Sequence, residues 1–247
     1  MEPIFEVVLK GGEKEVARLL RDDPAIVRTR ASRDSLVEAI PHWLYAGDTS
    51  LHLAAAGLWV GIARVLLESG ADPNTQSRRG ATPLHYACDP RPKSGGTWNP
   101  TAQASLIKML VEHGAEINRG DRGGATALHR AVRARSVAAV RQLLALGART
   151  DCALKKGCSS PLHLAVQPTG AGGTAGVVNE QLEIIDLLLQ HGADPAAADA
   201  AARTPVDWAR NERVVKALQS RPAKALSSRQ RPGKAPGARG GRRPTTR

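Results

Sequence analysis

The stretch "ATPLHYA", residues 81–87, is one of five copies of a short phrase along this 247-residue chain. The variants are "DTSLHLA" (48–54), "ATALHRA" (125–131), "SSPLHLA" (159–165) and the more divergent "RTPVDWA" (203–209). Such copies indicate either a recurring catalytic histidine or a duplicated structural unit. The Thr or Ser at the second position recurs after 33, 44, 34 and 44 residues. Periods of this size are typical of stacked repeats.

A second phrase, Leu-Leu-x-x-Gly-Ala, recurs in step with the first at "LLESGAD" (66–72), "LVEHGAE" (110–116), "LLALGAR" (143–149) and "LLQHGAD" (188–194). The distance from its glycine to the next phrase is nearly constant, so the two longer units carry their extra residues internally. These insertions are "DPRPKSGGTWNP" (89–100) and "QPTGAGGTAGVVN" (167–179). The pattern predicts a solenoid in which each unit packs on its neighbours.

Each unit predicts two helices and a loop. Thr followed by Pro favours a helix start, because the hydroxyl can cap a backbone N–H and Pro at the first helical position loses no needed hydrogen bond. The glycine of the second phrase, for example Gly70, suits the left-handed residue that ends a helix. Segments such as "ADPNTQSRRGA" are rich in turn-forming residues and predict hairpin-like loops.

With "TPLHYA" and the full set of markers, the chain resembles the ankyrin-repeat family. The resemblance implies an all-α solenoid of helix-turn-helix units with projecting finger loops. It also implies that the histidines of the phrase are structural and bond to the backbone and to the Thr of the phrase. Repeat spacing would keep them too far apart to ligate one metal ion, so we expect no metal site. They are His52, His85, His129 and His163.

The markers divide the chain into a repeat domain (1–220) and a tail (221–247). Within the domain we expect an N-terminal cap (1–30), an irregular insertion (31–47), repeats at 48–80, 81–124, 125–158 and 159–202, and a C-terminal cap (203–220). Both caps depart from the repeat pattern, as terminal repeats do. In the last one, Asp207 and Trp208 replace the usual His and small apolar residue.

The tail carries much of the net charge of +12, because residues 221–247 contain nine basic residues and no acid. It is rich in Pro and Gly and poor in apolar residues, so its composition predicts disorder. A basic tail can bind nucleic acid or acidic surfaces by releasing counterions, or it can be a solvated extension. It has no aromatic residue that could stack on bases.

Enzymatic chemistry finds little support in the sequence. "GAGGTAG" (170–176) superficially fits a dinucleotide loop, but the preceding "PLHLAVQ" is helical in register, and an insertion loop is the better interpretation. The three cysteines include no C-x-x-C pair. We therefore expect a non-enzymatic protein without a cofactor. The absence of a basic secretory leader or a long apolar run predicts a cytoplasmic protein that does not enter membranes.

The finger tips suggest a binding surface. Basic residues precede each phrase, so they should form a ladder along one edge of the stack. Charged turns are common in any solenoid, which is the simpler interpretation. The functional interpretation adds residues of the first helices and predicts a concave surface for a protein partner with an acidic segment. The predicted contacts are Arg78, Arg79, Tyr86, Arg122, Arg130, Arg133, Lys155, Lys156 and Arg203.

Two tryptophans lie in the irregular segments. Trp98, in the polar "GTWNP", either packs back on the helices or is an exposed anchor for the partner. Trp43, beside Ile40 and Leu44, is expected in the core. The sequence thus predicts a monomeric protein-binding scaffold, and the alternative is a nucleic-acid-associated protein that acts through its tail.

Overall fold

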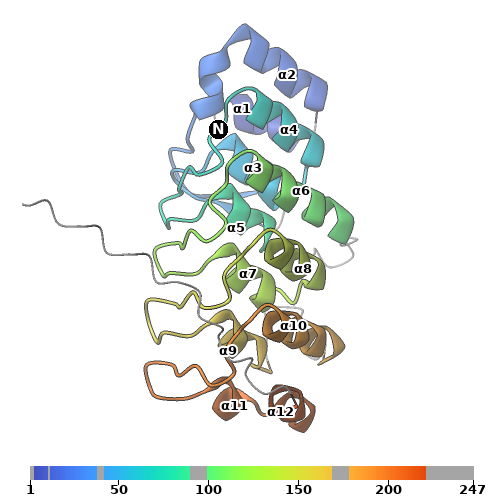
Figure 1. The fold of residues 1–247 in the computed structure, drawn as a ribbon. Helices are drawn as coiled ribbons and strands as arrows, with labels where there is room; N and C mark the ends of the chain where they lie inside the picture. Colours follow the sequence, from blue (N-terminus) through green and yellow to red (C-terminus); the bar gives the residue numbers. More distant parts are fainter. Residues whose placement is uncertain (1–2, 11, 38–41, 90–98, 169–177, 221–247) are drawn as a thin grey trace, which may run out of the picture.

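A computed structural model describes residues 3–10, 12–37, 42–89, 99–168 and 178–220 (Figure 1). Helices stack in two rows, and each helix of a row contacts the next one. The first helices of the units form the inner row: α3 (Ser50–Ala56), α5 (Pro83–Ala87), α7 (Ala127–Arg133), α9 (Pro161–Ala165) and α11 (Pro205–Trp208). The outer row consists of α4 (Val60–Glu68), α6 (Pro100–Glu112), α8 (Val137–Ala145), α10 (Val178–Gln190) and α12 (Glu212–Gln219).

The N-terminal end of the stack is closed by α1 (Pro3–Leu9) and α2 (Glu13–Asp22), which pack on α3 and α4 respectively. A short 3-10 helix, η1 (Pro24–Arg28), follows. The next segment is more regular than its sequence predicts, because β1 (Ser35–Val37) and β2 (His42–Leu44) pair antiparallel. The expectation of an irregular stretch over 31–47 is therefore wrong for these two strands, whose alternation of apolar and polar residues is too short to be distinctive.

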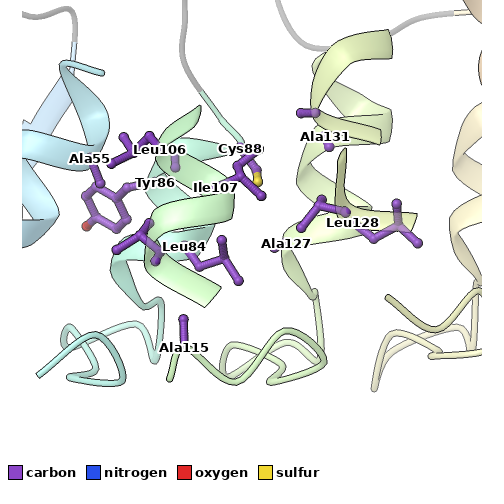
Figure 2. Packing of buried hydrophobic residues seen from close by; sticks show 14 of the residues in the cluster. Ala55, Leu84, Tyr86, Cys88, Leu106, Ile107, Ala115, Ala127, Leu128 and Ala131 are labelled. Atoms are coloured by element: carbon purple, nitrogen blue, oxygen red, sulfur yellow. The ribbon is translucent and has the colours of Figure 1, made fainter. Parts of the chain in front are cut away.

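The core runs along the stack between the two rows and is made of small and medium apolar residues. Figure 2 shows this packing around α5, α6 and α7, where Leu84, Leu106 and Leu128 are essentially inaccessible to solvent. Alanines such as Ala55 and Ala131 let adjacent inner helices approach closely. A chain with only 3% aromatic residues can bury a sufficient core because every layer is thin.

Helix ends follow the sequence signals. The Thr or Ser of every phrase immediately precedes an inner helix. The glycines at the ends of the outer helices have φ between +87° and +91°, a conformation that L side chains rarely adopt. The two outer helices that follow the insertions begin at Pro100 and Val178, so the first residue of each comes from the insertion that precedes it.

Glutamines secure the units that carry insertions. Gln103 of α6 is fully buried, and its amide donates to the carbonyl of Ala87 at the end of α5 (2.8 Å). Its own oxygen accepts a bond from Ser136 of the next unit (2.6 Å). Gln181 makes the equivalent bond to Ala165 (2.9 Å). These side chains occupy backbone acceptors at the base of each insertion, so the helix pair stays closed although the connection is long.

Several expectations concern residues beyond these ranges. Trp98 and most of both insertions lie outside the described residues, as does the tail 221–247. Trp43 is described, and its side chain is 49% exposed, so the expectation of a core residue is wrong. Its neighbour Leu44 occupies the core instead, at 3% exposure. Adjacent residues of a strand point to opposite faces, and here Leu44 has the inward one.

Candidate functional site

The finger loops form a continuous edge, visible at the left of the stack in Figure 1. Each finger donates a backbone N–H to a carbonyl of the preceding finger. The first two such bonds run from Arg78 to Ala46 (3.1 Å) and from Arg122 to Arg79 (3.0 Å). The next two run from Lys155 to Gly123 (2.9 Å) and from Ala200 to Gly157 (3.0 Å). This backbone ladder fixes the finger tips in register.

A surface pocket of about 480 Å³ opens on this edge. It is lined by Arg78, Arg79, Asp121, Arg122, Gly123, Ala125, Leu154 and Lys156. Four of these are basic residues that the sequence assigned to the ladder, and all four are exposed. Repeat spacing therefore brings cations from three successive fingers to one place. Lys155 is also exposed in its finger but does not line the pocket.

The acid in the pocket is already neutralised. Asp121 accepts a bond from Arg130 (2.9 Å) and bonds from the backbone N–H groups of Gly123 and Ala125. Burial opposes ionisation of this carboxyl, but Arg130 and the backbone bonds outweigh it and hold its pKa below the usual range. Arg122 and Lys156 make no ion pair within the described part of the chain. The pocket consequently retains positive charge.

Two basic side chains of the pocket are held in place by residues that come earlier in the chain. Arg78 pairs with Asp34 at 2.8 Å, although its side chain is still 57% exposed. The guanidinium of Arg79 lies over the ring of Tyr45, 4.5 Å from its centre. These contacts order both side chains at the rim of the pocket. An exposed pair such as the first contributes less than about 1 kcal/mol to stability.

The histidines of the phrase are structural, as expected. In each phrase the backbone N–H and the hydroxyl of the Thr or Ser contact Nδ1 of the His at 2.9 to 3.2 Å. A nitrogen that accepts a backbone N–H carries no proton, so Nε2 is the protonated atom. It donates to the carbonyl of the first residue of the next phrase, for example from His85 to Ala125 at 2.8 Å. Burial lowers the pKa of His85 and of His129 to about 4.

The last phrase uses an acid in the same position. Asp207 accepts the backbone N–H of Thr204 at 2.7 Å and its hydroxyl at 2.8 Å, and these bonds lower its pKa. A carboxylate can accept bonds from its own phrase but has no proton to donate onward. This replacement suits a unit that ends the stack.

Three residues proposed as partner contacts from sequence are engaged inside the molecule. Tyr86 is only 3% exposed and donates to the carboxylate of Asp48 at 2.9 Å, so it is not a surface contact. The sequence missed this because the helix is buried on more sides than its short phrase indicates. Arg130 bonds to Asp89 and Asp121, with 15% of its side chain exposed. Arg133 contacts Asp89 at 3.4 Å and remains half exposed.

Arg203 lies in the last finger, away from the pocket. It pairs with Asp199 at 2.9 Å and lies over the ring of Trp208, 4.8 Å from the ring centre. It lines a second surface pocket, of about 590 Å³, with Gln167, Pro168, Asp207, Trp208 and Arg210. The acids that position these cations were not singled out from sequence. The spacing in the sequence could have indicated them, because Asp121 and Asp199 each lie five residues before the Thr of a phrase.

The described residues contain no group of His, Cys, Asp and Glu that could hold a metal ion. Within the same ranges, no helix combines the length and apolar character that crossing a membrane requires. The connected, exposed feature is the cationic finger edge. Its geometry suits contact with an extended, negatively charged surface.

Comparisons with known proteins agree with this architecture. The family described as "Ankyrin repeats (many copies)" matches residues 51–89 and 104–144, and the one described as "Ankyrin repeat" matches 79–122 and 159–200. The human B-cell lymphoma 3 protein is 28% identical over 196 residues, covering 70% of this chain and 42% of that protein. Its mouse homolog is 29% identical over 147 residues, covering 60% and 29%.

A shorter match is the rat NF-kappa-B inhibitor alpha, which is 50% identical over 42 residues, or 17% of this chain and 13% of that protein. The chain spans less than half the length of these curated relatives. Repeated phrases, paired helices, a finger edge linked by backbone bonds and the family matches lead to one conclusion. The chain belongs to the ankyrin-repeat family.

Proposed function

We propose that this chain is a non-enzymatic scaffold that binds a partner protein through its cationic finger edge. The pocket residues Arg78, Arg79, Arg122 and Lys156 are the centre of that surface, and Lys155 extends it. The observation that carries the proposal is the convergence of four exposed cations around a carboxylate that is already neutralised. A protein surface with an acidic segment is the complementary partner.

The relatives support the class of function. Ankyrin-repeat proteins are interaction modules, and one matched relative is named as an inhibitor of NF-kappa-B. The fold alone does not name a partner, because repeat proteins share a scaffold while their surfaces differ. The proposal therefore specifies the surface and the charge of the partner. Tyr86 is excluded from that surface, and Arg130 contributes by holding Asp121.

Capture from a lysate of the source cells, with three baits compared by quantitative mass spectrometry, tests the proposal. The baits are the wild type, the finger variant Arg122→Glu/Lys156→Glu and the control variant Arg64→Glu/Lys108→Glu. The control changes the net charge equally, on the outer helices α4 and α6. We expect a partner that the wild type and the control retain and the finger variant loses, with equal melting temperatures for all three baits.

Equal loss in both variants would show a response to net charge alone and would refute a specific finger surface. A partner retained by the finger variant would refute it as well.

A truncation of residues 221–247 separates the nucleic-acid alternative, which the nine uncompensated basic residues of the tail favour. Under our proposal, the truncated chain keeps its protein partner. If the tail is the functional element, truncation instead abolishes binding to a random DNA duplex, and that binding weakens steeply with salt in the intact chain.

A further inference from the structure

We propose that the partner segment is amphipathic, with an apolar anchor that packs on Leu36 and Trp43 and an acidic stretch that follows it along the finger edge. This inference rests on the proposed function and specifies its ligand. The segment is extended and about eight or nine residues long. Its anchor site is the β1–β2 hairpin, which occupies the place of the first finger.

The hairpin presents an apolar pair to solvent. Leu36 and Trp43 are the exposed large hydrophobic residues of the described chain, at 58% and 49%. They are cross-strand partners in the register of β1 and β2. Side chains of directly opposed residues share one face and lie about 5 Å apart. The pair therefore forms one apolar contact area, while Leu44 on the opposite face anchors the hairpin in the core.

This apolar pair is continuous with the cationic pocket. Tyr45 follows the last residue of β2 directly, so it lies at most about 7 Å from Trp43 along the chain. Arg79, a pocket residue, covers the ring of Tyr45. At the base of the hairpin, Asp34 pairs with Arg78, and the carbonyl of Ala46 accepts the backbone N–H of Arg78. The hairpin is thereby joined to the pocket rim by side-chain and backbone contacts.

The distance from Trp43 to the finger of Lys156 sets the length of the partner segment. From Trp43 to Tyr45 the distance is about 7 Å, and adjacent layers of packed helices are roughly 10 Å apart. The path from the finger of Arg79 through that of Arg122 to that of Lys156 crosses two layers. The whole path is then about 27 Å, which an extended segment of about eight or nine residues covers at ~3.3 Å per residue.

Charge complementarity indicates that the partner segment is acidic beyond its apolar anchor. Arg122 and Lys156 carry exposed charges without an ion pair in the described part of the chain, so carboxylates opposite them gain attraction without displacing a partner. Asp34 and Asp121, by contrast, are already occupied by arginines. A partner segment that is basic or neutral beyond its anchor would offer the cations of the pocket no carboxylate to pair with.

Synthetic peptides test this arrangement by fluorescence anisotropy with the full chain. One probe carries a terminal tryptophan, a Gly-Ser spacer and an acidic stretch, a second reverses this order, and matched probes carry alanine instead of tryptophan. We expect one tryptophan probe to bind roughly tenfold more tightly than its alanine match, as burial of an aromatic anchor gives. The variant Leu36→Thr/Trp43→Thr keeps strand-forming residues and should remove this gain while leaving the alanine probes within about twofold.

The variant Arg122→Glu/Lys156→Glu should weaken all the probes that bind. Circular dichroism melting verifies that each variant is folded, and the single variants Leu36→Thr and Trp43→Thr should each remove part of the gain. Any of three results would overturn the inference. The tryptophan and alanine probes could bind equally well in both orders, the tryptophan gain could survive in Leu36→Thr/Trp43→Thr, or no probe could bind at all. The proposed function is judged separately, by the three-bait capture.

Discussion

The buried carboxylate of Asp48 makes a sharp prediction about stability. Both of its oxygens accept the hydroxyl of Tyr86 at 2.9 Å, and one accepts the backbone N–H of Tyr45 at 2.7 Å. Burial raises the pKa of Asp48 to about 7, although these hydrogen bonds act in the opposite direction. The substitution Asp48→Asn keeps the shape and removes the charge. We expect this variant to be more stable than the wild type in alkaline solution only.

The sign and the size follow from proton linkage. An unfolded chain releases the Asp48 proton near pH 4, whereas the folded chain keeps it until about pH 7. The wild type therefore loses stability as the pH rises through this window. The shift of about three pKa units corresponds to about 4 kcal/mol. Because Asn makes weaker bonds than a carboxylate, the net advantage of Asp48→Asn should be about 2 to 4 kcal/mol at pH 8 and close to zero at pH 4.5.

Urea unfolding followed by circular dichroism at both pH values measures this difference. His85 and His129 titrate in both proteins, so their contribution cancels in the comparison. Tyr86→Phe serves as a second variant, because it leaves the charge buried and removes a donor, and it should destabilise most above pH 7. A wild-type advantage at pH 8, or a difference between Asp48→Asn and wild type that does not change with pH, would refute the reasoning.

Two further predictions concern the repeat architecture. Gln103→Ala removes the donor to the carbonyl of Ala87 and the acceptor for the hydroxyl of Ser136, so it should lower the free energy of unfolding by about 2 to 4 kcal/mol in urea titrations. The control Gln190→Ala, at an exposed position, should change it by less than about 0.5 kcal/mol. In the Asp48→Asn background, stability should fall as the pH drops from 6.5 towards 4, by roughly 2.5 kcal/mol for each of His85 and His129, because the folded state resists protonation. A flat profile over this range would contradict the assignment of neutral rings.

The repeated phrases allowed most of the fold to be predicted. Thr-Pro starts, glycine ends and the structural histidines depend on local geometry, which short motifs specify directly. The alignment of the basic finger residues could also be predicted, because equal spacing from a phrase places residues at equal positions in successive units. Arg78, Arg79, Arg122 and Lys156 line one pocket for this reason.

Long-range side-chain partners could not be predicted from one sequence. The position of Arg130 in its phrase is that of a binding residue, yet Asp89, 41 residues earlier, and Asp121 both reach it from the preceding unit. Tyr86 is buried, and the acceptor that satisfies its hydroxyl, Asp48, lies 38 residues earlier in the chain. The hairpin was missed for a related reason, since three-residue strands depend on their pairing more than on their own composition.

The histidine bonds between units also bear on how such a chain changes its length. Every acceptor is a main-chain oxygen, supplied by Ala81, Ala125, Ser159 and Arg203, so the side chain at that position is irrelevant to the bond. A segment such as 126–159 contains both a donor, His129, and its acceptor, Ser159. In-frame gene duplication or deletion of such a segment would leave each imidazole with an oxygen to bond. Evolution can thus lengthen or shorten the array without redesigning the junctions.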